Sequence, residues 1–258
     1  MSYSFDLEWE MAPLGGGTGQ SYKGVKGEQT IFLKRNTTPF LAAVSVEGIA
    51  PKLLWTRRTA NGEGITAQEW IEGDTLQPVQ MVEHDVLAMV KAIHESATLK
   101  GMLEKIQGSS ATPTQLLAEY QESLQVDLRQ NSFLNRVVDY LYHTANQLEK
   151  VDSVVCHGDL SHANFLLEKT GRLYLVDWEN VKLCDPLLDV ASILCRYINY
   201  SDWEKWLEVY GVALTPSVQL RLQWFCILTY LMDIKKSHFY GRNHQVNYAI
   251  MMIKKIMQ

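Results

Sequence analysis

The sequence has few of the features that mark secreted, membrane-spanning or metal-structured proteins. It contains only four cysteines in 258 residues, and none of them forms a C-x-x-C pair, so zinc and redox motifs are not supported. The longest dense apolar stretch, residues 224–232, has about half the length that spans a bilayer. The first residues are acidic where a signal peptide needs a basic start and an apolar run. These absences predict a soluble cytoplasmic protein with buried thiols and no membrane span.

Charge of one sign is not in large excess either. The chain has 24 Lys and Arg residues against 29 Asp and Glu residues, which gives a net charge of −5. Broad nucleic-acid binding usually needs a strongly basic domain, so the composition argues against it. The apolar fraction of 47% and the charged fraction of 21% are those of an ordinary globular protein with a sizeable core.

The N-terminal region, residues 1–72, has the pattern of a small β-rich lobe. Residues 21–25 and 30–34 flank a turn at Lys26-Gly27-Glu28 and predict a hairpin. Residues 53–57 and 65–71 form a second predicted pair of strands, and residues 40–46 a short helix between the two pairs. No long helix is expected before residue 78.

The rest of the chain, residues 73–258, has mainly helical periodicity. Apolar residues keep to one helical face over residues 82–97, 116–128 and 133–148, and helical patterns return after residue 186. Thr112-Pro113-Thr114-Gln115 combines an N-cap, a first-turn proline and a capping-box glutamine. The sequence therefore predicts an α+β protein with a β-rich N-terminal lobe and a larger helical C-terminal lobe that join near Gly73.

One stretch interrupts the helical pattern and carries the chemistry. A polar loop runs from His157 through Asp159 to Asn164, and residues 165–168 and 173–176 then form the two equal arms of a hairpin. Equal arms predict that Asn164 and Asp177 become cross-strand neighbours. Two such oxygens suit Mg²⁺, and Asp159 could accept the proton of a substrate hydroxyl beside the metal. Loop capping is the alternative for each residue alone, but the convergence of all three favours a catalytic site.

The N-terminal lobe offers a complement to this site. Gly15-Gly16-Gly17-Thr18-Gly19 is a glycine-rich loop before a strand, and its backbone N–H groups could cradle phosphates. It is not a Walker A loop, because no Gly-Lys-Ser/Thr ends it. Matched hairpin arms should return Lys34 to the side of this loop. A plain surface loop and a solvated lysine are the alternatives, and the downstream carboxylates favour a phosphate site.

Three motifs resemble those of the aminoglycoside phosphotransferase and choline kinase-like family. They are His157-Gly158-Asp159-x-x-x-x-Asn164, Val176-Asp177-Trp178-Glu179 and Asp185-Pro186-Leu187-Leu188-Asp189. The resemblance covers nearly the whole chain and implies the two-lobed protein-kinase-like fold, with ATP- and Mg²⁺-dependent phosphorylation of a small-molecule hydroxyl. Within the family, the sequence is most similar to bacterial cell-cycle regulators of the CcrZ (YtmP-like) group, which implies protein partners in the cell-division machinery.

The resemblance implies a role for each matching residue. Asp159 becomes the catalytic base, Asn164 and Asp177 become the Mg²⁺ ligands, and Lys34 becomes the phosphate-contacting lysine of the N-terminal sheet. Kinases usually pair that lysine with a helical glutamate, but the expected helix at residues 40–46 contains none, and Glu47 comes only at its end. The glycine loop also departs from the G-x-G-x-x-G spacing, which puts nucleotide affinity in question.

Further positions are implied to support the site. Gln68-Glu69-Trp70-Ile71 resembles the hinge between the lobes, where the main chain of Glu69 and Ile71 would hold the adenine. Asp189 is expected to anchor the catalytic loop, with capping of the following helix as the alternative. His157 is expected to brace the loop.

The acceptor is expected to bind in the helical lobe. Glu179 and Asp202 could bind an amine or sugar hydroxyls, but the modest acidity favours a neutral substrate such as a sugar, for instance a pentose, or an amino alcohol. Basic residues at positions 235, 236, 242, 254 and 255 predict a solvated face, with a polyanion or partner site as the alternative. Two interpretations are open for the aromatic residues Tyr197, Tyr200, Trp203, Trp206 and Tyr210. They could form a cage for a quaternary ammonium group, or they could belong to an aromatic stripe of the core, which is the favoured interpretation.

Two other functions compete with a small-molecule kinase. A regulatory scaffold that acts through protein partners is motivated by the resemblance to cell-cycle regulators and by the missing helical glutamate. A protein kinase is disfavoured, because Gly158 stands where protein kinases carry arginine and no activation segment of usual length separates Asp177 from Asp185.

Overall fold

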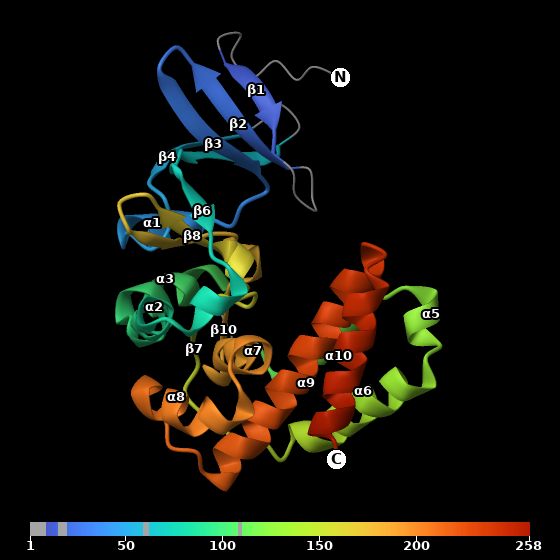
Figure 1. Cartoon of the computed structure of the whole chain (residues 1–258). Coiled ribbons are helices and arrows are strands. Elements are labelled where there is room, and N and C mark those ends of the chain that lie inside the picture. Colours follow the sequence, from blue (N-terminus) through green and yellow to red (C-terminus); the bar gives the residue numbers. More distant parts are fainter. Residues whose placement is uncertain (1–8, 15–19, 59–61, 108–109) are drawn as a thin grey trace.

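The N-terminal part of the chain is a five-stranded antiparallel sheet with the strand order β1-β2-β3-β5-β4 (Figure 1). The computed structural model describes residues 9–14, 20–58, 62–107 and 110–258. The predicted hairpin is confirmed, with Gly27 in the turn at φ +58°, where glycine is favoured. The strands are β1 (Glu10–Pro13), β2 (Ser21–Lys26), β3 (Gln29–Arg35), β4 (Leu53–Arg58) and β5 (Gly64–Glu69).

Helix α1 (Leu41–Val46) lies between β3 and β4, as predicted, but its apolar side chains belong to the core of the helical part. Phe40 and Val44 are fully buried there. The Arg172 guanidinium donates to the carbonyl oxygen of Gly48 at 3.1 Å, and the backbone N–H of Leu175 donates to that of Ile49 at 2.9 Å. The segment that follows α1 is therefore bonded to the hairpin that carries the predicted site.

Two small sheets lie between the large sheet and most of the helices (Figure 1). One has the order β6-β8-β9, from β6 (Gly73–Thr75), β8 (Phe165–Glu168) and β9 (Leu173–Leu175). The second small sheet consists of β7 (Val154–Cys156) and β10 (Lys182–Cys184). The sequence pattern did not predict β10. Gly73 lies so close to β8 that a Cβ atom at this position would be 2.1 Å from the carbonyl oxygen of Leu167, so the pairing of β6 with β8 requires glycine here.

The helical part packs around α7 and α9, and α9 and α10 lie side by side (Figure 1). Short 3-10 turns join the larger elements: η1 (Pro78–Val82), η2 (His162–Asn164), η3 (Trp178–Asn180) and η4 (Tyr200–Asp202). The helices are α2 (His84–Glu95), α3 (Ala97–Gln107), α4 (Pro113–Gln121), α5 (Val126–Arg129), α6 (Ser132–Ala145), α7 (Leu187–Tyr197), α8 (Trp203–Tyr210), α9 (Pro216–Phe239) and α10 (Asn243–Ile256).

Two helix boundaries differ from the periodicity. The pattern over residues 82–97 predicts one helix, but α2 ends before Ser96, whose hydroxyl accepts from the N–H of Leu99 and so caps α3. The capping box at Thr112 is confirmed, with reciprocal bonds to Gln115 at 3.2 and 2.8 Å. Helix α4 nevertheless stops at Gln121 although the apolar pattern runs to residue 128, because the chain turns at Ser123, which has a φ of +53°.

The four cysteine thiols are free and buried, as expected. Within the described ranges, no helix combines the length and the apolar character that crossing a membrane requires.

Candidate functional site

The loop from His157 to Asn164, called the 157–164 loop below, leads from β7 into β8. Asn164 ends this loop in η2 and is 8% exposed. Its side-chain Nδ2 donates to the carbonyl oxygen of Asp159 at 2.8 Å, which fixes the orientation of the amide. The amide oxygen of Asn164 is thereby left to accept from, or coordinate, a group outside the loop.

The hairpin after the loop has a different register from the predicted one. Phe165 pairs with Leu175, and the N–H of Val176 donates to the carbonyl oxygen of Asn164 at 2.9 Å, so Asn164 faces Val176 rather than Asp177. The expected register is wrong because Arg172 belongs to the second arm, where its carbonyl oxygen accepts from the N–H of Glu168. The connection therefore has three residues, 169–171, instead of four, and Gly171 closes it at φ +90°.

Asp177 follows directly and turns away from the strand. Its backbone is left-handed, with φ 73° and ψ 53°, a conformation that non-glycine residues rarely adopt. The strained backbone sends its carboxylate toward the N-terminal sheet, where Asp177 Oδ1 contacts Lys34 Nζ. The same lysine lies 2.8 Å from Glu179 Oε1. One lysine of β3 therefore bridges to two carboxylates that follow β9.

Lys34 is placed by the hairpin register. It pairs with Ser21, at the end of β2 where the chain arrives from the glycine-rich loop. The predicted phosphate-cradling residues Gly15, Gly16, Gly17, Thr18 and Gly19 lie outside the described residues. Glu47 caps the C-terminal end of α1 and forms no ion pair with another described residue. The carboxylate partners of Lys34 are thus Asp177 and Glu179, not a glutamate of α1.

The two carboxylates beside Lys34 titrate differently. Burial opposes the charge of Asp177, but its hydrogen bonds with Glu179 and Lys34 outweigh burial and hold its pKa below the usual value. Burial and the neighbouring Asp177 raise the pKa of Glu179. The pKa of Lys34 is raised by the two acids in spite of its burial. Asp177 is therefore the ionised member of the pair, which suits a metal ligand.

Asp189 holds the backbone of the 157–164 loop from α7. Its carboxylate accepts from the N–H of His157 at 2.7 Å and from that of Gly158 at 2.9 Å, and His94 Nε2 lies 3.2 Å from the same group. Asp189 is 2% exposed, and burial would raise its pKa, but the hydrogen bond with His94 and the nearby charges lower it overall. These bonds are those of a loop anchor, and no side-chain cap of α7 involves Asp189.

His157 lies under the loop and is fully buried. Its Nε2 is 2.9 Å from the carbonyl oxygen of Val176, and its Nδ1 accepts from the N–H of Asp159 at 3.3 Å. Burial lowers the pKa of His157, which keeps the ring neutral and lets Nδ1 accept. The ring thus ties the loop to the residue before Asp177.

Asp159 projects from this anchored loop, with 20% of its side chain exposed. Its Oδ2 lies 3.1 Å from Nζ of Lys236 on α9. Arg196 of α7 donates to the carbonyl oxygen of Leu160 at 3.3 Å, and the hydroxyl of Tyr197 accepts from the N–H of His162 at 3.0 Å. Sequence reasoning missed His94, Arg196 and Lys236 as parts of the site, because no local spacing links them to the loop and only packing brings them there.

The residues predicted as a hinge, Glu69 and Ile71, lie where the chain leaves the large sheet. Glu69 ends β5, and its N–H donates to the carbonyl oxygen of Lys52 at 2.9 Å. The buried Gln68 fixes the same segment by donating from its side chain to the carbonyl oxygen of Pro51 at 2.8 Å. Ile71 lies between β5 and β6, where the chain passes from the large sheet to the sheet that contains β8.

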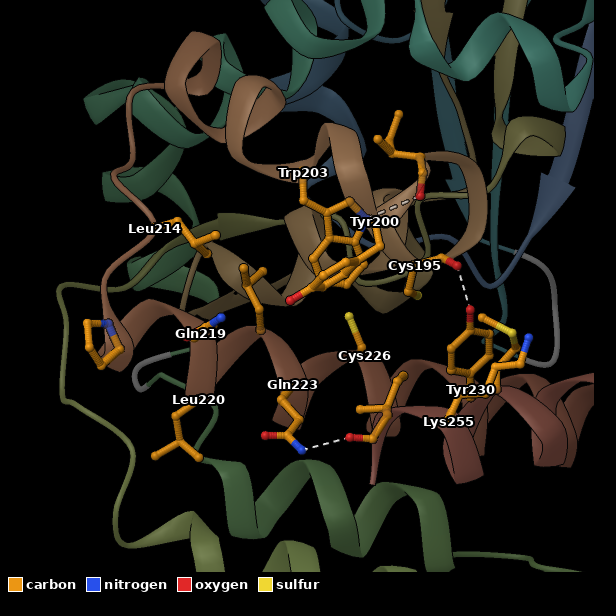
Figure 2. Close-up of a pocket in the computed structure, with 15 residues that line it drawn as sticks. Cys195, Tyr200, Trp203, Leu214, Gln219, Leu220, Gln223, Cys226, Tyr230 and Lys255 are labelled. Atoms are coloured by element: carbon orange, nitrogen blue, oxygen red, sulfur yellow. Dashed lines mark hydrogen bonds between the residues drawn. The ribbon is translucent and has the colours of Figure 1, made fainter. Parts of the chain in front are cut away.

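The aromatic residues that could have formed a cage are divided among different environments. Trp206 and Tyr210 stack at 5.9 Å in the core, and the hydroxyl of Tyr210 bonds to His94 at 2.6 Å. Tyr200 and Trp203 instead line a cavity of about 650 Å³ between α7, α9 and α10 (Figure 2). That cavity is lined by none of the predicted site residues, and Asp202 is exposed in η4. The five residues therefore form no single cage, and two of them are in the favoured core positions.

Comparison with known proteins identifies relatives of this arrangement. The profile of the phosphotransferase enzyme family (APH) matches residues 29–225. Choline kinase LicA from Streptococcus pneumoniae has a TM-score of 0.73 at 21% identity, over 96% of this chain and 95% of that chain. Another structure of LicA is a complex with AMP.

Two further solved structures support the same fold. A choline/ethanolamine kinase family protein from Mesorhizobium loti has a TM-score of 0.66 at 16% identity, over 96% of this chain and 88% of that chain. A thermostable mutant of aminoglycoside phosphotransferase APH(4)-Ia, in a ternary complex with AMP-PNP and hygromycin B, has a TM-score of 0.59 at 16% identity, over 96% and 92% of the two chains. These likenesses confirm the expected two-lobed kinase-like fold.

Proposed function

The chain belongs to the phosphotransferase enzyme family, and from that premise we propose that it transfers the terminal phosphate of ATP to a hydroxyl group of a small molecule. The observation that carries the proposal is the contact of Lys34 with Asp177, which joins a cation of the N-terminal sheet to an ionised carboxylate beside the 157–164 loop. A nucleotide phosphate needs such a cation and a metal-binding carboxylate at one point. The acceptor class we propose is a sugar, such as a pentose, or an amino alcohol.

Asp159 is the proposed base. Its carboxylate is partly exposed on a loop whose backbone is bonded to Asp189, so it can receive the proton of a bound hydroxyl without leaving its anchored position. Lys34 would bind the phosphates of ATP by charge, and the main chain at Glu69 and Ile71 would hold the adenine. The chain supplies orientation and proton transfer, which are the main protein contributions to this kind of reaction.

The donors present fit Mg²⁺. The free amide oxygen of Asn164 and the ionised carboxylate of Asp177 are hard oxygen ligands, which is the donor set that Mg²⁺ takes together with phosphates and water. When bound, the ion would neutralise charge on the phosphates of the nucleotide. Glu179, with its raised pKa, lies beside Asp177 and is better suited to hold Lys34 than to bind the metal.

The test is ADP release with Mg²⁺ and ATP across a set of hydroxylated metabolites. Asp159→Asn should lower turnover by roughly 10²–10⁴-fold, because the base is lost. Binding of a fluorescent nucleotide should be retained, since Asp159 does not hold the nucleotide. Asp152→Asn, an exposed change before β7, is the matched control and should leave turnover unaltered. Full turnover by Asp159→Asn would overturn the assignment of the base.

A role in cell-division control rests only on the sequence resemblance to CcrZ-like regulators. The presence of Lys34, Asp159, Asn164 and Asp177 together supports an enzyme over a pure scaffold, since a protein that acts through binding alone has no physical need for them. Pull-downs with the wild type and Asp159→Asn, with and without nucleotide, would separate the two. Partner capture that ignores both changes would favour the scaffold.

A further inference from the structure

A cavity of about 450 Å³ lies beside Asp159 and is the place where an acceptor can reach this residue. Its walls come from α4, the 157–164 loop, α7 and α9, and Asp159 and Gly158 form part of its lining. The cavity is large enough for a sugar-sized molecule. Its charges therefore decide which acceptors can bind next to the proposed base.

Each carboxylate that lines this cavity already has a basic partner. Asp159 pairs with Lys236 at 3.1 Å, and Asp233 makes two bonds with the guanidinium of Arg196, at 2.6 and 3.0 Å. The third carboxylate, Glu119, pairs with Lys182. A cationic acceptor would consequently meet no unpaired carboxylate among the described residues that line the cavity.

One basic residue remains in excess. Lys235 lines the cavity, and its Nζ donates to the carbonyl oxygens of Glu119 and Glu122 at 2.9 and 2.5 Å, but it pairs with no carboxylate of the residues that the structure describes. An ammonium group has three donors, so Lys235 retains one and Lys236 retains two for a ligand. With four basic and three acidic side chains, the lining has a net charge of 4 − 3 = +1.

The aromatic residues at this cavity also disfavour a cationic acceptor. Phe239 and Tyr240 are exposed at its edge and pack edge-to-face at 5.1 Å. The guanidinium of Arg242 lies 5.2 Å from the centre of the Tyr240 ring, so a protein cation already covers one face of this ring and competes with a quaternary ammonium group for it.

We propose that the acceptor carries an anionic group, a phosphate ester or a carboxylate, which Lys235 and Lys236 bind while its hydroxyl faces Asp159. The inference rests on the proposed kinase function and narrows its acceptor class: it retains a sugar that carries an anionic group and excludes an amino alcohol without one. The pair of Lys236 with Asp159 is partly exposed, with 59% of the lysine side chain accessible, and such pairs contribute little stability. An incoming anion can therefore take over Lys236 and release Asp159 to receive the proton of the hydroxyl.

The experiment compares matched acceptors that differ in charge. Ribose 5-phosphate is compared with ribose, and glycolate with ethylene glycol and ethanolamine, by ADP release and by calorimetric binding in the presence of a non-hydrolysable ATP analogue. We expect the anionic member of at least one set to have a kcat/KM, or a binding constant, about tenfold or more above its neutral counterpart, which corresponds to about 1.4 kcal/mol. The two sets distinguish a phosphate from a carboxylate as the recognised group.

Variants identify the residues responsible. Lys235→Met and Lys236→Met should each lower the preference for the anionic member by about tenfold, with nucleotide binding retained. Lys105→Met, which removes an exposed lysine of α3 outside the cavity, is the control and should keep the preference. Raising the salt concentration should weaken binding of the anion and not that of its neutral counterpart.

The failures are distinguishable. Turnover of ribose at least as fast as that of ribose 5-phosphate, together with turnover of ethylene glycol or ethanolamine at least as fast as that of glycolate, would overturn this inference and leave the kinase function standing. The same conclusion holds if no anionic member binds more tightly than its neutral counterpart, or if both lysine variants keep the preference. Absence of nucleotide binding by the wild-type chain would instead contradict the proposed function itself.

Discussion

Replacing Asp189 by asparagine should separate the anchoring of the 157–164 loop from the chemistry of Asp159. Both oxygens of Asp189 are in use: one accepts from Gly158 N–H at 2.9 Å, and the other accepts from His157 N–H at 2.7 Å and lies 3.2 Å from His94 Nε2. Asparagine has one acceptor oxygen, so in either orientation its NH₂ group faces a backbone N–H. One buried donor is then left without a partner in a site that is 2% exposed.

The magnitude follows from these bonds. A buried donor without a partner costs about 1–3 kcal/mol, and loss of a charge-assisted bond is of similar size, so Asp189→Asn should lose about 2–4 kcal/mol of unfolding free energy at pH 7.5. The pKa of Asp189 is lowered in the folded chain, so its stabilisation is present above the unfolded value of about 3.9 and is lost as the pH falls below it. The difference in unfolding free energy between Asp189→Asn and wild type should therefore become smaller as the pH falls.

The assay combines urea unfolding with kinetics. A shifted loop moves Asp159, so kcat should fall by roughly 10- to 100-fold. The KM for ATP should change little, since Asp189 does not contact Lys34, the lysine proposed to bind the phosphates of ATP. Asp152→Asn, exposed and outside the site, should match wild type in both measurements. An Asp189→Asn protein with wild-type stability and wild-type kcat would refute the role of Asp189 as an anchor.

Two further predictions concern the cation and the brace of the site. Lys34→Met removes the positive charge that contacts Asp177 and Glu179, so the dissociation constant of a fluorescent ATP analogue should rise about tenfold or more; an unchanged constant would contradict a phosphate role. His157 is buried with a lowered pKa while the unfolded chain takes up its proton near pH 6.5, so stability should fall below that pH, by up to about 1.4 kcal/mol at pH 5.5. Urea unfolding at several pH values should show that His157→Gln loses less unfolding free energy on acidification than wild type. The exposed change His143→Gln should keep the wild-type pH dependence of this free energy, and an equal pH dependence in all three proteins would reject the explanation.

The sequence predicted the elements whose signals are local. Gly27 marks the first hairpin, and Thr112 with Gln115 marks the start of α4, because turn and cap preferences act over a few residues. Periodicity was less reliable for helix ends: the break at Ser96 and the turn at Ser123 depend on a hydroxyl cap and on a left-handed backbone, neither of which changes the apolar pattern.

The predicted register of the site hairpin shows the limit of counting residues. Equal arms about a four-residue turn were expected to set Asn164 opposite Asp177, but the turn is one residue shorter, with Gly171 at positive φ, and this shifts the pairing by one position. The left-handed backbone of Asp177 then aims its carboxylate at Lys34 across the two parts of the chain. Side-chain direction in a hairpin depends on turn geometry, and the sequence permits more than one turn.

The sequence by itself determined the two-part organisation and marked Lys34, Asp159, Asn164 and Asp177 as candidate site residues, since motif spacing and hydrophobic pattern are written along the chain. Only the tertiary structure decided what surrounds them. Asp189 reaches the loop backbone from α7, and Lys236 reaches Asp159 from α9 across 77 positions of sequence. Two of the basic residues that were expected on a solvated face, Lys235 and Lys236, line the cavity beside Asp159. The physical reason is that helix packing, and not local preference, fixes which distant charges share a cavity.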